Sequence, residues 1–478
     1  MKLQHLDISN FRCFKNFSID LYPCFNILIG RNGSGKSTLL HAIQKTLSFI
    51  FSTDRSVSED FLSAGMTNLN IRTFDTTDFY FDLTSRIPAK SAYIHSKATF
   101  GDNPIDWTLY KRNAGKASLY PSLYKKAFNI VMERISNGAD FPLLAYYSDS
   151  YPHKNVKQMQ SALDKIKNDV LPRNFGYFQW DEETSCTAIW EKRLSDRLAR
   201  MLPLYTPAMR LASEEMELSE QPKTEQTIQR LQEIRKEQEK YDALMKPLYN
   251  ETNYIEEKLK HFISLLPSVE GENYGISHLS VDADDSGYHL LLNFENGKAS
   301  TIAGLPAGYR RLISIVIDLA YRSFILNDDK DSSGVVIIDE IDLHLHPSLE
   351  GSVVNAFRQC FPLVQFIVST HSVAVISNIS TAEVDPNNRV FILKDGVEQP
   401  EPLNNLNGID YDIVLRDFMD SYSRNEDIKS LIDQCLTYYS YDMTEEADTI
   451  YTQIEDAVGK NSKVMTELNE KIANYKSR

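Results

Sequence analysis

Three short apolar runs along the chain each end in glycine, acidic or hydroxyl-bearing residues. The runs are Phe25–Ile29, Val335–Ile338 and Val364–Val368. Apolar runs of this length, bounded by such residues, predict strands that are buried on both faces, as in a parallel sheet. Because the carboxyl ends of parallel strands meet at one edge of a sheet, the residues that follow the three runs are expected to lie close together.

The first run is followed by a phosphate-binding pattern. Segment Gly30–Ser37 has the spacing GxxxxGKS, and apolar residues at helical spacing follow it, namely Leu39, Leu40, Ile43 and Leu47. In such a P-loop the glycines let backbone N–H groups face phosphates, Lys36 reaches the β- and γ-phosphates, and Ser37 ligates Mg²⁺. The residues expected to bind the nucleotide are Gly30, Arg31, Asn32, Gly33, Ser34, Gly35, Lys36, Ser37 and Thr38.

The second and third runs end in residues suited to ATP hydrolysis. Asp339 follows the second run and is expected to hold Mg²⁺ together with Ser37, while Glu340 is expected to orient or deprotonate the attacking water. His371 follows the third run and is the candidate sensor of the γ-phosphate. The expected catalytic residues are therefore Glu340, His371 and Lys36.

Two histidines after the acidic pair raise a separate question. His344 and His346 lie two positions apart, as metal ligands often do, but no further ligand cluster is near them in the sequence. We favour a turn after Asp342 that faces a second subunit.

The segment LPAGYRR, Leu305–Arg311, stands where many ATPases carry a serine-glycine-glycine signature that grips the γ-phosphate. Pro306 takes the place of the serine, which removes a hydroxyl and a backbone N–H. Ala307 and Gly308 still permit close approach of main-chain N–H groups to a phosphate, and a helix is expected directly after them. We therefore expect a slow, switch-like ATPase.

These motifs, in this order, resemble the ABC-type ATPase heads of the SMC, RecF and OLD kind. Lys36 and Asp339 are 303 positions apart, so a long insertion divides the nucleotide site. The resemblance implies that the signature of one head, here Ala307 and Gly308, closes over ATP and Mg²⁺ held by another head. It also suggests that Arg12 approaches the phosphates; Asp60 is a candidate for the glutamine-loop position.

Other stretches are similar to the PtuA family, the stand-alone ATPases of Septu and related retron anti-phage systems. These stretches are Phe141–Tyr151, Arg173–Leu194, Ala307–Arg322 and Gly408–Met419. The resemblance implies an ATPase that forms oligomers and controls a separate HNH-type nuclease, PtuB, to restrict phage. The chain shows neither a TOPRIM acidic cluster after His371 nor an HNH arrangement, which is an independent reason to expect a nuclease partner.

The expected fold is α/β, an ABC-type head with a mixed sheet flanked by helices and interrupted by a mainly helical insertion. We expect four regions: an N-terminal lobe with the P-loop (1–135), the insertion (136–265), a C-terminal lobe with signature and acidic pair (266–400), and an acidic helical tail that docks a partner (401–478). Within the insertion, residues 214–265 predict a short helical hairpin that breaks near Pro247. Apolar positions in the tail indicate that it folds, namely Ile413, Leu415, Phe418, Ile428, Leu431 and Ile432.

Composition narrows the class of partner. The net charge of −15 argues against tight, sequence-independent DNA binding by the whole chain. The five cysteines form no CxxC pair, and no signal core or long apolar run is present, so we expect a cytoplasmic protein without a membrane contact.

A local DNA contact stays possible on composition alone. Residues 86–126 combine basic and aromatic side chains, a composition found on nucleic-acid surfaces, although their alternation is also that of ordinary antiparallel strands. The alternative function is accordingly a RecF- or SMC-like ATPase that acts on DNA in repair or recombination. A transporter motor is disfavoured by the long insertion.

Overall fold

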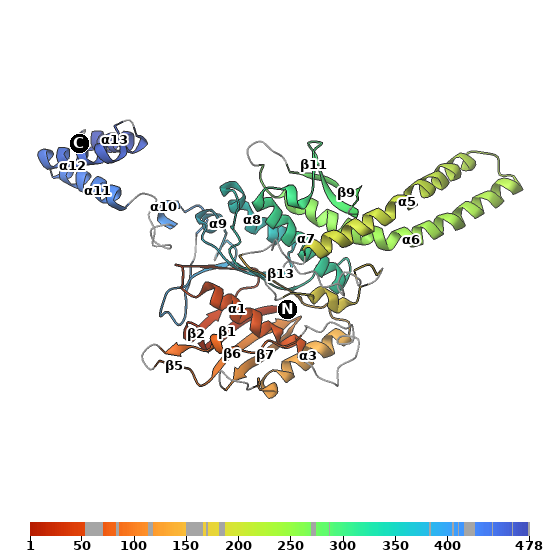
Figure 1. Cartoon of the computed structure of the whole chain (residues 1–478), viewed down its shortest axis with the longest axis horizontal. Helices are drawn as coiled ribbons and strands as arrows, with labels where there is room; N and C mark the ends of the chain where they lie inside the picture. Colours follow the sequence, from red (N-terminus) through yellow and green to blue (C-terminus); the bar gives the residue numbers. More distant parts are fainter. Residues whose placement is uncertain are drawn as a thin grey trace. The chain divides into compact units, whose positions relative to one another are not determined.

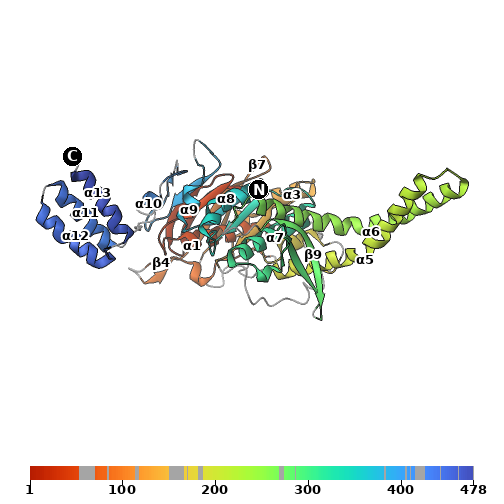
Figure 2. The same ribbon diagram turned by 90° about the horizontal axis from the view of Figure 1, so that it is seen from above.

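The computed structural model describes the chain except for residues 53–69, 83–85, 113–117, 150–165, 169–170, 181–186, 269–273, 286, 382–383, 404–405, 410, 415–425, 442, 461 and 477–478. The chain forms two compact units, Met1–Gly408 and Ile409–Arg478. Figure 1 shows the elements of each unit, and Figure 2 shows them from above. Among the helices in the described ranges, none is long and apolar enough to cross a membrane.

The first unit is built around a six-stranded sheet. Its strand order is β15-β14-β3-β13-β12-β8, and all neighbours are parallel except β14 and β15. The strands are β15 (Pro402–Leu403), β14 (Arg389–Ile392), β3 (Phe25–Ile29), β13 (Val364–Ser369), β12 (Gly334–Ile338) and β8 (Leu143–Tyr147). The three apolar runs of the sequence are β3, β12 and β13, and the prediction of buried parallel strands is confirmed.

Strand β8 lies within the range that was expected to form the mainly helical insertion. Leu143 pairs with Gly334 and Tyr147 pairs with Ile338, so β8 belongs to the core sheet. All five residues of β8 are buried, and a run that is apolar throughout does not reveal by its period whether it is strand or helix. The expectation of helix is therefore wrong at β8.

A second, antiparallel sheet has the order β2-β1-β6-β7. It consists of β1 (Lys2–Phe11), β2 (Phe14–Asp20), β6 (Ala92–Phe100) and β7 (Asn103–Lys111), which confirms the predicted antiparallel strands of the basic, aromatic segment. Helix α1 (Lys36–Leu47) contacts β13 of the first sheet and β6 of the second. The four apolar residues predicted to face inward from α1 are all fully buried, namely Leu39, Leu40, Ile43 and Leu47.

Helices α5 (Thr187–Ser219) and α6 (Glu225–Ser264) form a helical hairpin. They run side by side in both views (Figures 1 and 2). Helix α6 continues through Pro247, so the break predicted there is wrong, and the turn of the hairpin lies at residues 220–224. Leu248 and Ile255, buried on the C-terminal side of the proline, anchor that part of α6 by packing, which outweighs the loss of one backbone hydrogen bond.

The signature segment leads into helix α7 (Ala307–Asn327), which contacts the hairpin helices and β8. A three-stranded sheet, β11 (Ala299–Ser300), β10 (Gly287–Phe294) and β9 (Ile276–Asp284), packs against the hairpin. The remaining elements of the first unit are α3 (Lys125–Ser136), α8 (Pro347–Cys360), α9 (Val373–Ser377), β4 (Phe81–Asp82) and β5 (Ile87–Pro88).

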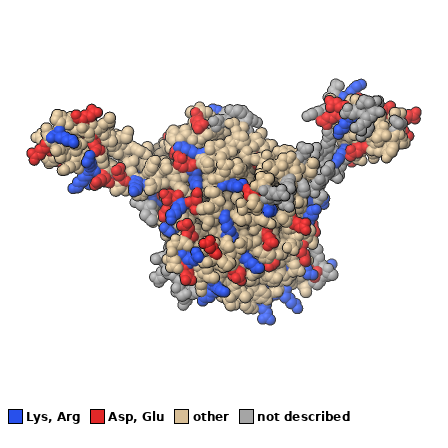
Figure 3. Space-filling model, turned by 180° about the vertical axis from the view of Figure 1, so that it is seen from behind, with Lys and Arg blue, Asp and Glu red and all other residues tan. Residues whose placement is uncertain are grey.

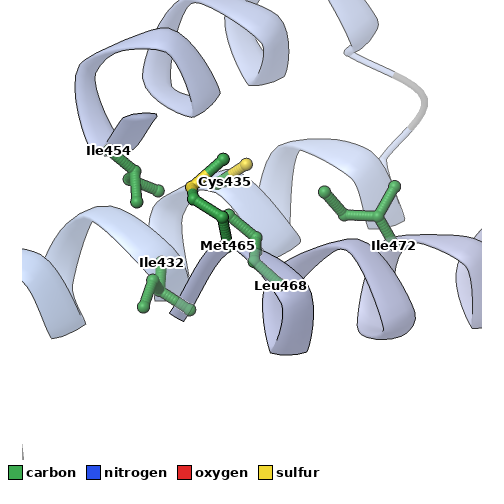
Figure 4. Packing of buried hydrophobic residues seen from close by; sticks show 6 residues of the cluster. All are labelled: Ile432, Cys435, Ile454, Met465, Leu468 and Ile472. Carbon is green, nitrogen blue, oxygen red and sulfur yellow. The ribbon is translucent and has the colours of Figure 1, made fainter. Parts of the chain in front are cut away.

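The second unit contains α10 (Tyr411–Ile413), α11 (Glu426–Ser440), α12 (Thr444–Val458) and α13 (Lys463–Lys476). Its core consists of Ile432, Cys435, Ile454, Met465, Leu468 and Ile472 (Figure 4). Ile432 is buried and Ile428 and Leu431 pack against this core, as predicted for a folded tail, whereas Ile413 is exposed. Two of the apolar positions named for the tail, Leu415 and Phe418, lie outside the described residues.

Candidate nucleotide site

The residues expected to act on ATP follow three neighbouring strands. Strand β13 lies between β3 and β12, so the P-loop after β3, the acidic pair after β12 and the segment after β13 share one edge of the sheet. Backbone bonds join their ends: the Thr370 amide donates to the Leu28 carbonyl (3.2 Å), and the Ile341 amide donates to the Ser369 carbonyl (3.0 Å). The structure therefore brings together segments that are more than 300 positions apart.

The P-loop has the backbone that its glycines predict. Gly33 and Gly35 have φ values of 85° and 99°, in the left-handed region that favours glycine. A Cβ at Gly35 would also meet the ring of Phe14 and the sulfur of Cys13. The Ser34 hydroxyl is buried and, within the described chain, has no hydrogen-bond partner. A buried polar group left without a partner in this loop fits a site that phosphate oxygens complete.

The Lys36 side chain lies over the P-loop. Its Nζ donates to the carbonyl oxygens of Gly30 (2.8 Å) and Arg31 (3.1 Å). Burial lowers the pKa of Lys36, and the charges of Asp339 and Glu340 oppose this shift. Lys36 is thus close enough to the acidic pair to be influenced by it, as a shared site requires.

Asp339 is buried and held by Ser369. The Ser369 hydroxyl donates to Asp339 Oδ1, and the same hydroxyl accepts the Glu340 amide (2.8 Å). The Asp339 amide donates to the Tyr147 carbonyl on β8 (2.8 Å). One serine therefore fixes both acidic residues, a role that the sequence did not reveal.

Glu340 adopts a left-handed backbone conformation, with φ of 52°. Such a conformation costs about 1–3 kcal/mol in a residue other than glycine and is found where the surrounding structure imposes it. Burial raises the pKa of Glu340, and the nearby charges of Asp339, Asp149 and Asp342 raise it further, while His371 opposes them. A carboxylate with a raised pKa is a stronger base, which suits activation of water.

Arg311 holds this strained segment in place. Its Nη2 donates to the carbonyl oxygens of Asp339 (2.8 Å) and Glu340 (3.2 Å), and its Nη1 donates to the Asp149 carbonyl (3.0 Å). Its side chain is almost completely buried. Sequence reasoning missed this role, since only the position of the arginine in the signature segment marked it.

His371 and its neighbours complete the edge. His371 is half-buried, and its charge influences Glu340. Thr370 Oγ1 donates to Asp342 Oδ1 (2.5 Å), which ties the segment after β13 to the loop after the acidic pair. His346 caps α8 by accepting the Ser348 amide (3.3 Å), and across the described residues no group of three or more His, Cys, Asp or Glu forms a metal cluster.

Of the three signature residues, two are exposed and one is buried. Pro306 and Ala307 are exposed at the N-terminus of α7. Gly308 is buried: a Cβ there would lie 2.6 Å from the His344 carbonyl oxygen of the same chain. Its lack of a side chain is thus explained by packing within the head, whereas Ala307 is exposed.

Two further residues, Arg12 and Asp60, were predicted near the nucleotide, and Arg12 directly precedes Cys13, whose sulfur lies against Gly35 of the P-loop. Arg12 Nε donates to Asp78 Oδ1 (2.9 Å), and the Arg12 backbone amide donates to the Asp78 carbonyl (2.8 Å). The carboxylate of Asp78 is buried and also pairs with Lys45. Asp60 lies outside the described residues.

A P-loop and an acidic strand end on neighbouring parallel strands, with a signature helix and a second antiparallel sheet, define an ABC-type ATPase head. The chain belongs to the AAA ATPase domain family, whose model matches residues 1–376. The α/β fold class expected from the sequence is confirmed. The chain is an ATPase, and the resemblance to PtuA-like ATPases is confirmed by the relatives that follow.

Two relatives and one solved structure match large parts of the chain. The chain is 25% identical over 381 residues to the retron Vc95 probable ATPase of Vibrio cholerae serotype O1 biovar El Tor, which covers 75% of this chain and 68% of the relative. It is 26% identical over 211 residues to the Septu protein PtuA of Bacillus mycoides (strain KBAB4), covering 42% and 28%. Among solved structures, the Smc head domain of Pyrococcus furiosus with an extended coiled coil, bound to the C-terminal domain of ScpA, matches with a TM-score of 0.42 and 14% identity, covering 84% and 96%.

Proposed function

We propose that this chain is the ATPase subunit of an anti-phage defence complex, which pairs head to head through its nucleotide sites and controls a separate HNH-type nuclease. One observation supports the proposed ATPase activity: Lys36, Asp339 and Glu340 lie close together at one edge of the sheet. The defence part is supported by the similarity to a Septu protein and a retron ATPase. The proposal places the protein in the cytoplasm.

In this proposal the P-loop binds the phosphates of ATP. The Lys36 amine exchanges the carbonyls of Gly30 and Arg31 for phosphate oxygens, and the Ser34 hydroxyl gains a partner. Ser37, exposed at the start of α1, and Asp339 would hold Mg²⁺, which neutralises phosphate charge.

Glu340 is the proposed base. Its raised pKa favours proton uptake from a water placed between the acidic pair and the phosphate. His371, close enough to influence Glu340, is the proposed contact to the γ-phosphate. Hydrolysis is proposed to be slow, because Pro306 offers neither hydroxyl nor N–H to a phosphate held by a second head.

The substitution Lys36→Ala separates nucleotide binding from folding. Without the amine, the charge that neutralises the β- and γ-phosphates is lost, so ATP binding is expected to disappear while the melting temperature without nucleotide changes little. The measurement is ATP affinity by calorimetry. An unchanged affinity would remove Lys36 from the site.

The nuclease partner is tested by purification from the native operon with a tag on this chain. An HNH-type protein that co-purifies, together with a neighbouring gene that encodes it, supports the defence complex. Recovery of the chain without any nuclease, in cells that express the whole operon, contradicts it.

A DNA-repair ATPase is the second candidate, favoured by basic and aromatic residues on β6. Tyr93 and Lys97 are exposed on one face of this strand. Two other members of the basic, aromatic segment are buried: Trp107 packs on Phe49, and Lys111 donates to the Phe74 carbonyl (2.6 Å). On the face that Figure 3 draws, basic and acidic side chains of the first unit are mixed. Salt-dependent duplex binding strengthened by ATP would favour this candidate, and no binding at low salt would remove it.

A further inference from the structure

The hairpin of α5 and α6 is closed by its own contacts. On α5 the inward positions follow a heptad spacing, and Met201 and Leu211 on this side are buried. Ion pairs add to the seam: Arg230 binds Glu214 (2.7 Å), and Arg235 binds Glu215 (3.1 Å). The two helices therefore need no further apolar residues to hold together.

A second apolar stripe nevertheless runs along α5. Its residues directly follow the inward-facing positions in the sequence, so the stripe lies on an adjacent face of the helix. The stripe consists of Leu202, Tyr205, Met209, Ala212 and Met216, spaced three, four, three and four positions apart. Its large members are exposed: Leu202 by 55%, Tyr205 by 42%, Met209 by 67% and Met216 by 70%. Alternating steps of three and four are the spacing of a coiled-coil seam, whereas isolated exposed apolar residues have no such period.

Helix α6 extends this face at one end. The pKa of Tyr205 is raised by burial, with further contributions from Tyr249 and Glu256, so Tyr249 lies near the stripe. Tyr249 is itself half exposed. A helix that carries two adjacent heptad seams is typical of a bundle of more than two helices, and the hairpin supplies only two.

We propose that this stripe, Leu202 to Met216 on α5, pairs with the same stripe of a second copy of the chain, in antiparallel orientation about a two-fold axis. The four helices would then form a bundle. A two-fold contact is self-complementary, so one surface serves both copies. Met209 lies in the middle of the stripe and hence near the axis.

Charge favours the second copy and the antiparallel direction. Exposed Arg200 lies just before the N-terminal end of the stripe, whereas exposed Glu217 and Glu220 lie at its C-terminal end. Antiparallel pairing places the basic part of one helix beside the acidic end of the other, while parallel pairing places like charges together.

The size of the stripe sets the strength of the contact. Its fourteen helical steps span about 21 Å at about 1.5 Å per residue. Three or four large side chains from each copy bury less than the roughly 1,200–2,000 Å² of an ordinary specific interface. The contact is therefore weak by itself and concentration-dependent. It differs from head pairing because it needs no nucleotide and does not rest on the proposed function.

The test is sedimentation equilibrium of the full chain without nucleotide, in the Lys36→Ala background, which isolates the hairpin contact from nucleotide-driven pairing. Met209→Glu is compared with Leu244→Glu, which changes an equally exposed leucine on α6 outside the stripe. We expect the parent and Leu244→Glu to dimerise, and Met209→Glu to weaken dimerisation by about tenfold or more, because two charges meet at the axis.

Met216→Glu serves as a second variant of the stripe and is expected to act in the same direction. Melting temperatures of all variants check that each is folded. Equal dimerisation of Met209→Glu and Leu244→Glu overturns the proposal. A parent that stays monomeric at every soluble concentration also overturns it, and that result would point to a different protein as the occupant of the stripe.

Discussion

Arg311 donates a hydrogen bond of 2.8 Å to the carbonyl oxygen of Asp339, from a helix that begins at the signature segment. The same guanidinium nitrogen reaches the Glu340 carbonyl, the residue with left-handed backbone. Helix α7, which begins at the exposed Ala307, is thus tied directly to the backbone of the proposed base. A movement of α7 on head pairing has a physical route to Glu340.

Arg311→Lys is expected to reduce ATP turnover by about 10–100-fold while ATP affinity changes by less than about threefold, because one ammonium cannot span three carbonyls and Glu340 loses its orientation. The measurement compares kcat with ATP affinity. Arg310→Lys, at the neighbouring exposed-side position, is the control. A parallel loss of kcat and affinity, or no loss, would show that Arg311 does not act through Glu340.

Glu340→Gln is expected to raise the melting temperature of the nucleotide-free protein more at pH 8 than at pH 5. The pKa of Glu340 is raised in the folded state, so its ionised form costs stability. That cost is absent below the unfolded-state pKa and complete above the folded-state pKa. Thermal melts at both pH values measure the difference.

The matched control for this pH effect is Glu217→Gln, an exposed glutamate on α5. It should show no such dependence. If the gain for Glu340→Gln is the same at both pH values, the raised pKa of Glu340 is contradicted.

Gly308→Ala is expected to destabilise the head by about 1–3 kcal/mol, the usual cost of overpacking a tight site. The new methyl group would lie 2.6 Å from the His344 carbonyl, which is backbone and cannot rotate away. Thermal unfolding measures the effect, and Ala307→Ser, at the exposed neighbour, should leave stability unchanged. An unaltered melting temperature in Gly308→Ala would contradict this prediction, because it would mean that the backbone at His344 shifts to make room for the methyl group at little cost.

Pro306→Ser is expected to raise ATP turnover at protein concentrations where heads pair. The serine restores a hydroxyl and an N–H at the exposed N-terminus of α7, where a γ-phosphate from a second head is proposed to lie. Steady-state turnover over a range of protein concentrations measures this. Equal turnover in the two proteins rejects the link between Pro306 and a slow ATPase.

Much of the site could be predicted because its parts are local in sequence. Two motifs follow directly after buried strands, namely the P-loop with Lys36 and the acidic pair. The apolar run predicts the strand, and the motif after it predicts which end of the strand carries the site. The role of Arg311 could not be predicted in this way. It depends on three carbonyls, one after β8 and two after β12, which only the packing of α7 brings within reach.

The errors have similar causes. Strand β8 is apolar throughout and lacks the alternation that reveals a strand. Pro247 predicts a helix break by local chemistry, but tertiary packing of the following turns maintains α6. Gly308 was expected to let main-chain N–H groups approach a phosphate, which stays a prediction, and the structure adds a packing role within the head that the motif did not reveal.

The central claim is that ATP is bound by the P-loop and hydrolysed through Glu340. Single-turnover hydrolysis by wild type and Glu340→Gln at saturating ATP, with ATP affinity measured beside it, tests this claim most directly. The account predicts that Glu340→Gln keeps ATP bound and loses hydrolysis by about 100-fold or more. Equal hydrolysis by the two proteins would contradict it.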